Sequence, residues 1–428
     1  MNDVSASTSD TTESDLEDYS LRARNWLIEN LQPRAKTIDS HLQRTSAAYY
    51  TPEIMASNRA LQRTIFEAGY AGITWPKEYG GQGLSKLHEE VFIRDSSDFV
   101  TPDFGVLGNT TFQICVPTML AHSTPAFLSY FIPKVLAGEA LVCQFFSEPL
   151  AGSDLAGVRT RATRDGDQWT LSGQKTWSTF AHLADWGMCL TRTDWDVPKH
   201  RGLTWFAVPC NSSGLTIRRI NQISDEADFC EAFFDDVVVP FENRIGEIND
   251  GWTVTQTMLV FERGAGRATD GEALTNPGLL APDLVSLAQK AASLGDPVVR
   301  QKLARAHTID FVGKSLALRI EQRGRLGGFN PGMAAYGKLF RGTYNPIRAR
   351  IAVEIGGSAA MTWETSDANG AETSLAYLNG RKSAIAGGTN EIQRNGISER
   401  DLGLPREPSF DTGRPFSEVI RDANNWTS

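Results

Sequence analysis

The chain has 428 residues, of which 41% are hydrophobic and 22% charged, the usual balance of a globular protein with a large core. Its formal net charge of −9 is not accompanied by a basic stripe interleaved with aromatic residues, so we expect no nucleic-acid binding. The length suggests roughly two to three domains.

The cysteines and histidines show no metal-binding pattern. The five cysteines form no C-x-x-C pair, and the six histidines show neither the H-x-x-x-H nor the H-E-x-x-H spacing. We therefore expect reduced thiols, no metal ion and a cytoplasmic location. The polar, acidic start of the chain differs from a secretory signal or a mitochondrial presequence, and no run approaches the roughly eighteen apolar residues of a membrane span.

Residues 15–140 are predicted to form an N-terminal helical domain, preceded by a disordered tail at residues 1–14. From residue 15 onward the apolar side chains recur at intervals of about 3.6 residues, with Ser14 or Asp15 placed to cap the first helix. Similar helical patterns follow at residues 60–68, 89–96 and 112–122 and around Pro133.

The pattern changes between residues 141 and 248. Apolar residues alternate along the chain near Trp169 and near Trp205, and the run Asp165-Gly166-Asp167 is typical of a tight turn. These features predict short antiparallel strands in a compact barrel or sandwich.

Helical patterns return after Gly251 and predict a C-terminal helical bundle at residues 249–404. A glycine- and proline-containing run at 264–283 is predicted to be a loop or a poorly ordered insertion, and 405–428 to be a tail. The fold class expected is therefore α+β and multidomain, with helices, then a β domain, then helices. The expected C-terminal helices cover residues 252–263, 281–294, 297–325, 333–354 and 376–385.

One segment of the middle domain has the composition of a ligand-binding loop. Residues 147–154 read SEPLAGSD, and the strand pattern that follows leads to Trp177. Hydroxyls at Ser147, Ser153 and Thr179, a close backbone approach at Gly152 and the aromatic face of Trp177 are suited to a flat polar ring. Taken alone, the Gly-Ser-Asp run is typical of an ordinary turn.

Taken in order, this segment closely resembles the flavin-binding middle domain of the acyl-CoA dehydrogenase family. The resemblance continues in four further stretches, and the last of them is similar to the C-terminal signature of the family. These stretches are GITWPKEYGG at residues 72–81, KHRGLTWF at 199–206, VVVP at 237–240 with GW at 251–252, and AGGTNEIQRN at 386–395.

The resemblance implies a non-covalent FAD. No G-x-G-x-x-G motif follows a predicted strand, so a Rossmann-type FAD site is not expected. The arginine signature of the family for the flavin pyrophosphate is not visible, and Arg300 is the candidate in its region. The residues implied as cofactor contacts are Gln144, Ser147, Ser153, Trp177 and Thr179 in the middle domain, and Gly356, Gly357, Thr389, Glu391 and Gln393 in the C-terminal domain.

The resemblance also implies a carboxylate that removes the α-proton of a thioester while a hydride leaves the β-carbon for the flavin. Many members place this base just before a glycine in the C-terminal signature, where this chain has Gly387. Other members place it on the first long helix of the C-terminal domain, before an arginine. Glu262 and Arg263 match that position, which makes Glu262 the expected base and Arg263 a substrate contact; the alternative is that Glu262 is an ordinary solvated helix residue.

Gly387 keeps a role in the implied mechanism. Its backbone N–H would donate to the thioester carbonyl, and the missing side chain would widen the acyl pocket. Alternatively, Gly387 and Gly388 serve only a turn.

The function implied is FAD-dependent α,β-dehydrogenation of an acyl-CoA, with a bulky, branched or steroid side-chain acyl group and an electron-transfer flavoprotein as acceptor. The expected assembly is a homodimer, a homotetramer or a heterotetramer with a related subunit. Two alternatives remain: a non-catalytic partner subunit of a heteromeric dehydrogenase, and a flavin monooxygenase or oxidase with the same fold.

Overall fold

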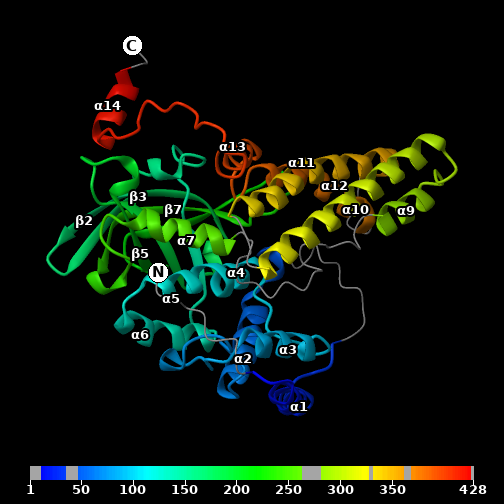
Figure 1. Ribbon diagram of the computed structural model, residues 1–428, viewed down its shortest axis with the longest axis horizontal. Helices are drawn as coiled ribbons and strands as arrows, with labels where there is room; N and C mark the ends of the chain where they lie inside the picture. Colours follow the sequence, from blue (N-terminus) through cyan, green and yellow to red (C-terminus); the bar gives the residue numbers. More distant parts are fainter. Residues whose placement is uncertain (1–10, 35–46, 263–280, 327–330, 361–367, 426–428) are drawn as a thin grey trace. The chain divides into compact units, whose positions relative to one another are not determined.

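The computed structural model describes residues 11–34, 47–262, 281–326, 331–360 and 368–425 (Figure 1). The chain divides into two compact units. The first contains Met1–Gln222, Glu226–Glu262 and Asp411–Ser428, and the second contains Arg263–Phe410 with Ile223–Asp225. Most of the tail predicted to be disordered and most of the predicted loop at 264–283 lie outside the described residues.

The first unit begins with helices, as the apolar periodicity predicts. Thr12 caps the first of them: its hydroxyl accepts a hydrogen bond from the amide of Asp15, and the Asp15 carboxylate accepts one from the amide of Thr12. The prediction of Ser14 or Asp15 as the cap was therefore wrong. These helices are α1 (Glu13–Asn30), α2 (Pro52–Glu67), α3 (Lys86–Ser96), α4 (Gly105–Thr110), α5 (Val116–His122) and α6 (Pro125–Leu136), with a π-helical turn at Thr111–Cys115 between α4 and α5.

The middle of the chain forms one eight-stranded sheet in the order β6-β7-β3-β2-β4-β5-β8, with β1 paired to β4 outside this path. The predicted turn at Gly166 joins β2 to β3 in an antiparallel hairpin. Two pairings, β1 with β4 and β2 with β4, are parallel, which corrects the expectation of antiparallel strands alone. The strands are β1 (Val142–Phe145), β2 (Arg161–Asp165), β3 (Gln168–Thr179), β4 (Trp186–Arg192), β5 (Leu203–Pro209), β6 (Leu215–Ile220), β7 (Phe229–Pro240) and β8 (Arg244–Ile245).

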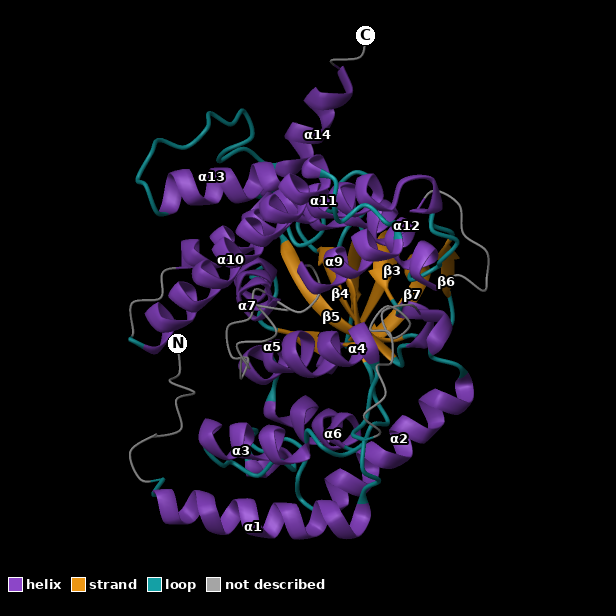
Figure 2. Ribbon diagram, turned by 90° about the vertical axis from the view of Figure 1, so that its right-hand side faces the viewer, coloured by secondary structure: helices purple, strands orange, loops and turns teal. Residues whose placement is uncertain are grey.

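Strands β4 and β5 are buried on both faces because a hydrophobic cluster lies on each side of them. On one side, Phe206 packs against Trp169 of β3, with ring centroids 5.2 Å apart, so the two halves of the sheet face one another as in a barrel or sandwich. On the other side, Trp205 joins the cluster built by the N-terminal helices. Figure 2 shows α4 and α5 against the strands, with α1, α3 and α6 on the far side of these helices.

Two helices complete the first unit. Helix α7 (Gly251–Glu262) packs on β5, α5 and the π-helical turn. Helix α14 (Phe416–Asn425) lies in the segment expected to be a tail (red in Figure 1). Phe416 and Val419 give α14 a buried face, so residues 416–425 of the segment predicted to be a tail form a packed helix.

The second unit is helical. Its hydrophobic cluster joins α9 (Ala281–Lys290), α10 (Pro297–Arg325) and α11 (Pro331–Gly356) through Leu284, Ala306 and Ile351. Helices α12 (Ala368–Gly380) and α13 (Asn390–Arg400) pack on α11. None of the helices within the described ranges is long and apolar enough to cross a membrane. Within the same ranges, no three His, Cys, Asp or Glu side chains gather as a metal site would require.

Candidate functional site

The SEPLAGSD loop leaves β1 as a tight turn. The Ser147 carbonyl accepts a hydrogen bond from the amide of Thr176 at 2.9 Å, which ties the start of the loop to β3. Glu148 and Ala151 exchange backbone hydrogen bonds of 3.0 and 3.1 Å. Beyond this turn Gly152 and Ser153 are exposed, and among the described residues no atom outside Gly152 and its two chain neighbours lies within 4 Å of the position of a Cβ at Gly152. The tip of the loop is therefore open to a ligand.

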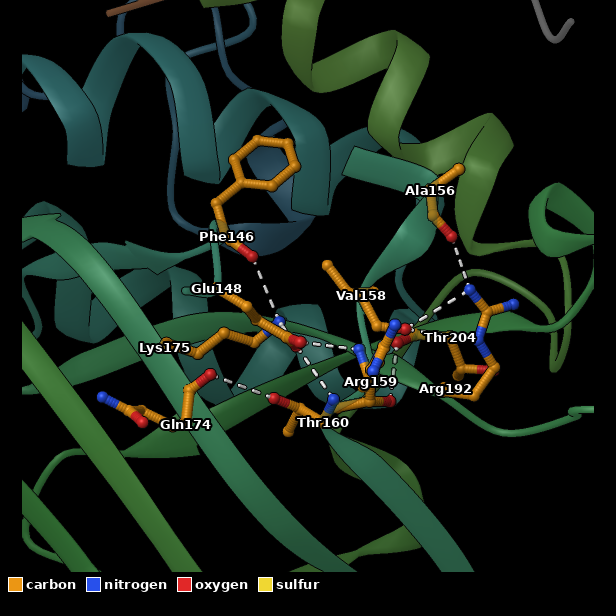
Figure 3. Close-up of polar contacts among 11 residues, drawn as sticks. Phe146, Glu148, Ala156, Val158, Arg159, Thr160, Gln174, Lys175, Arg192 and Thr204 are labelled. Atoms are coloured by element: carbon orange, nitrogen blue, oxygen red, sulfur yellow. Dashed lines mark hydrogen bonds and ion pairs between the residues drawn. The ribbon is translucent and has the colours of Figure 1, made fainter. Parts of the chain in front are cut away.

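A buried ion pair between Glu148 of this loop and Lys175 of β3 holds the loop against the sheet (Figure 3). Lys175 is fully buried, and its ammonium lies 2.8 Å from Glu148 Oε1 and 3.1 Å from the carbonyl oxygen of Phe146. Glu148 also accepts hydrogen bonds from the amides of Arg159, at 2.6 Å, and Thr160, at 2.9 Å. One carboxylate therefore connects the loop, β2 and β3.

Burial alone would raise the pKa of Glu148, but the positive charge of Lys175 and the hydrogen bonds from Lys175, Thr160 and Arg159 outweigh it and lower that pKa. Glu148 is therefore ionised at neutral pH. Neither residue of this pair carries a local sequence signal that distinguishes it from a surface charge.

Trp177 is presented outward by a β-bulge. In the pairing of β3 with β7 the register shifts between Lys175 and Ser178, so one extra residue of β3 is accommodated there. Trp177 has a φ of 61°, which is rare for a bulky residue, and its side chain is 59% exposed. Its ring meets Phe229 edge-on at 5.9 Å, and Thr179 lies half-buried two residues further along β3. Such strain is characteristic of functional positions.

Gln144 on β1 connects the start of this segment to α7. Its side-chain amide donates to the sulfur of Met258 at 3.1 Å, and Glu262 follows Met258 by one helical turn. Burial raises the pKa of the Cys115 thiol, and the negative charge of Glu262 raises it further. Helix α7 itself packs on the π-helical turn that contains Cys115. Glu262 is half-buried, and Arg263 lies outside the described residues.

Trp205 holds α7 in place. Its indole N–H donates both to the carbonyl oxygen of Gly251 and to the hydroxyl of Thr255, each at 3.0 Å. Gly251 allows the close approach, because a Cβ at this position would lie 2.7 Å from the Leu203 backbone. The first turn of α7 is thus fastened to β5, and the direction of the helix determines where Glu262 lies.

In the second unit, the AGGTNEIQRN stretch forms a turn followed by α13. Thr389 caps α13 by accepting a hydrogen bond from the amide of Ile392 at 3.2 Å. Gln393 is buried, and its side-chain amide donates to the Gly387 carbonyl oxygen at 3.1 Å. Gly387 and Gly388 have φ values of 67° and 90°.

The other expected cofactor residues of the second unit are less closely grouped. Gly356 ends α11, and Gly357 follows with a φ of 58°; in the described part of the chain, no atom beyond its two neighbours lies within 4 Å of its Cβ position. Glu391 is 76% exposed and pairs with Arg394 at 3.2 Å. Arg300 lies exposed in the first turn of α10. The structure therefore brings together Gly387, Thr389 and Gln393 in one turn. In the first unit, Gln144, Ser147, Ser153, Trp177 and Thr179 follow one another along the chain from β1 to β3, and no contact that joins all five is found among the described residues.

Comparison with known proteins gives matches along almost the whole chain. Three family models match in order: the acyl-CoA dehydrogenase N-terminal domain at residues 15–139, the middle domain at 143–237 and the C-terminal domain at 249–402. The acyl-CoA dehydrogenase IpdE1 of Mycobacterium tuberculosis is 36% identical over 393 residues, which cover 92% of this chain and 99% of that protein. The acyl-CoA dehydrogenase FadE34 of the same organism is 37% identical over 351 residues, which cover 81% of this chain and 46% of the length of FadE34.

Solved structures show the same architecture. A structure named Tcur3481-Tcur3483 steroid ACAD has a TM-score of 0.71 at 25% identity, over 93% of this chain and 99% of the matched one. The ChsE4-ChsE5 complex of Mycobacterium tuberculosis has a TM-score of 0.66 at 25% identity, with the same two coverages.

The order of helical domain, sheet domain and helical domain is the three-domain architecture that these family models describe. The chain belongs to the acyl-CoA dehydrogenase family. The expected family, fold class and enzyme class are thereby confirmed.

Proposed function

We propose that the protein catalyses FAD-dependent α,β-dehydrogenation of an acyl-CoA thioester, with Glu262 as the base. The observation that carries this proposal is the place of Glu262 in the last described turn of α7, a helix that packs on the π-helical turn, and one turn beyond the residue that binds Gln144. Gln144 begins the stretch that carries the proposed flavin contacts. A carboxylate at this position can act as a general base without any contribution from Gly387, which has no side chain.

The residues present fit a flavin in the first unit. An open loop tip at Gly152 and Ser153 and an outward-facing indole at Trp177 lie along one continuous stretch of chain. Ser147, Ser153 and Thr179 would bind the polar edge of the ring system, and Trp177 would cover its face. When bound, the flavin supplies the acceptor for the hydride that leaves the β-carbon. Glu262 takes the α-proton and holds it on its carboxylate.

The turn at Gly387 is suited to holding the thioester carbonyl. The backbone hydrogen bonds recorded within the described ranges leave the Gly387 N–H without an acceptor, while its carbonyl is held by Gln393. An amide fixed in this way is a preorganised donor, and a hydrogen bond to the thioester oxygen lowers the pKa of the α-proton. Thr389, Glu391 and Gln393, with Gly356 and Gly357, are proposed to contact the dinucleotide part of FAD.

We further propose a bulky acyl group as substrate, with Arg263 as a substrate contact. The similarity to a structure named steroid ACAD supports this choice, and the missing side chain at Gly387 would leave room for the bulk. An electron-transfer flavoprotein is the proposed acceptor, in the cytoplasm. The assembly is proposed to be a homodimer or homotetramer, or a heterotetramer as the neighbouring ChsE4-ChsE5 complex suggests; in a heterotetramer this chain could instead be the non-catalytic subunit.

The test is turnover of a panel of straight, branched and steroid acyl-CoA thioesters with an artificial electron acceptor. We expect the matching enoyl-CoA to form with the bulkier substrates, and little oxygen to be consumed when the acceptor is omitted. Rapid oxygen consumption would favour the oxidase or monooxygenase alternative. Turnover that requires a second, related chain would favour the non-catalytic subunit.

Replacing Trp177 with Ala is expected to weaken FAD binding about threefold to tenfold, the usual worth of one aromatic stacking contact. The folded apoprotein should keep its thermal midpoint, because the indole is mostly exposed and alanine meets the same backbone strain at a positive φ. Titration of the flavin-free protein with FAD, followed by flavin fluorescence, measures the effect. Trp177→Phe is the control that keeps an aromatic face. Equal affinities for all three proteins would show that this ring does not contact the flavin.

Replacing Gly387 with Ala is expected to lower the free energy of unfolding by about 1–2 kcal/mol, because a Cβ is strained in the left-handed conformation. Gly387→Asn should cost less, since asparagine tolerates this region. Denaturant titration of the two variants and the parent gives the comparison. If Ala proved as stable as Gly, the turn would not depend on the positive φ.

A further inference from the structure

The segment that was expected to be a C-terminal tail is attached to the first unit, at residues 194–201. The Phe416 amide donates to the Val197 carbonyl oxygen at 2.9 Å, and the Ser417 amide donates to that of Trp195 at 2.8 Å. The Phe416 ring is 4% exposed and stacks on Trp195 with centroids 5.9 Å apart. Residues 411–425, called the C-terminal clip from here on, therefore have a defined docking place.

Arg192 connects the clip to the chain that leaves the SEPLAGSD loop. It is fully buried at the end of β4, and its guanidinium donates to the carbonyl oxygens of Ala156 and Val158 (Figure 3). A further bond of 2.6 Å reaches the carbonyl oxygen of Lys199. The guanidinium carbon lies 4.2 Å from the centroid of the Phe416 ring, a cation–π contact that also covers the charge.

Lys199 makes a second connection. Its ammonium lies 2.8 Å from Asp154 Oδ1, at the end of the SEPLAGSD loop, and 2.5 Å from Asp411 Oδ2, at the start of the clip. The Lys199 and Asp411 side chains are only 14% and 12% exposed, so water screens this pair weakly. Asp154 directly follows Ser153, one of the proposed flavin contacts. The clip is thus connected through two side chains: Arg192 contacts the residues that follow the loop, and Lys199 contacts the end of the loop itself.

We propose that the C-terminal clip is a positioning element for the SEPLAGSD loop, and that it strengthens FAD binding by holding Phe416 on Arg192 and Asp411 on Lys199. The tip of the loop is exposed at Gly152 and Ser153. A loop that is ordered before binding loses less conformational entropy when the ligand arrives, which raises the affinity. This inference rests on the proposed flavin contacts at Ser147 and Ser153.

Two substitutions test the two connections separately. Phe416→Ala removes the ring from Arg192, and Asp411→Asn removes one carboxylate from Lys199 with little change of shape. Each is expected to weaken FAD binding to the flavin-free protein about threefold to tenfold, the range expected for one desolvated cation–π or ionic contact. Amide hydrogen exchange at residues 152–158 should become faster in both variants. Phe416→Tyr, which keeps an aromatic face, should retain the parent affinity.

The matched control is Asp422→Asn on the same helix. Asp422 pairs with Arg414, with side chains 40% and 36% exposed, and none of its recorded contacts involves Arg192 or Lys199. This variant should match the parent both in FAD affinity and in exchange of the loop. A parent protein that binds no FAD would refute the proposed function itself. The inference alone fails if the parent binds FAD and both Phe416→Ala and Asp411→Asn match it in affinity and loop exchange, whatever their melting temperatures.

Discussion

Replacing Glu262 with Gln is expected to slow flavin reduction by an acyl-CoA by a factor of about 10² to 10⁴, the usual cost of removing a general base. Glutamine keeps the size and helix propensity of glutamate, so α7 and its anchor at Trp205 should remain. Only the ability to accept the α-proton is lost. The measurement is the rate of flavin bleaching after rapid mixing with substrate in the absence of oxygen.

The control for this change is Glu247→Gln. Glu247 is a carboxylate of the same unit, 80% exposed and paired with Arg244 at 2.9 Å. The Glu247→Gln variant should bleach at the parent rate and contain as much FAD as the parent. Glu262→Gln should also contain as much FAD as the parent. A Glu262→Gln enzyme that bleaches at the parent rate would show that another group takes the proton.

The second large effect is expected at Lys175. Lys175→Met would leave the Glu148 carboxylate buried without its cation, and breaking a buried ion pair in this way typically costs about 3–5 kcal/mol of folding free energy. The double variant Lys175→Met with Glu148→Leu has no stranded charge and should recover part of this loss. The free energy of unfolding of each apoprotein in urea gives the comparison. Equal stability of Lys175→Met and the parent would show that the pair contributes nothing.

The loss of folding free energy caused by Lys175→Met should depend on pH. In the parent, the pKa of Glu148 is lowered from its usual 4.5, so its contribution to stability is present above pH 4.5 and is lost as the pH falls through the lowered value. In Lys175→Met the ammonium that lowers this pKa is removed while the burial that raises it remains, so we expect the folded protein to hold a proton on Glu148 more readily than the parent does. The difference between the two proteins should therefore be largest at neutral pH and shrink toward acid.

The helices were predictable because their signals are local. Apolar residues at helical spacing predicted a helix over residues 297–325, and α10 has the same bounds. The first cap was missed although its signal was present, since Thr12 and Asp15 have the spacing of a capping box. Helix α14 was also readable, because Phe416, Val419 and Ile420 have the spacing of an amphipathic helix.

The parallel pairings and the buried charges were not predictable in this way. β1 pairs with β4 across more than one intervening strand, and no local pattern specifies that choice. Glu148 and Lys175 are 27 residues apart, and each reads as a surface charge until the fold buries both. Arg192 also reads as a surface charge in the sequence, and only the fold shows that it is buried beneath the Phe416 ring. The cofactor contacts and the base stay predictions that rest on motif positions and on the geometry around Glu262.

The most direct test of the account is an anaerobic titration of the purified, FAD-loaded protein with straight, branched and steroid acyl-CoA thioesters. We expect at least one bulky thioester to bleach the visible flavin absorption of this chain alone, with formation of the enoyl-CoA. Failure of every thioester to bleach a fully loaded flavin would contradict the assignment of this chain as an acyl-CoA dehydrogenase that uses Glu262.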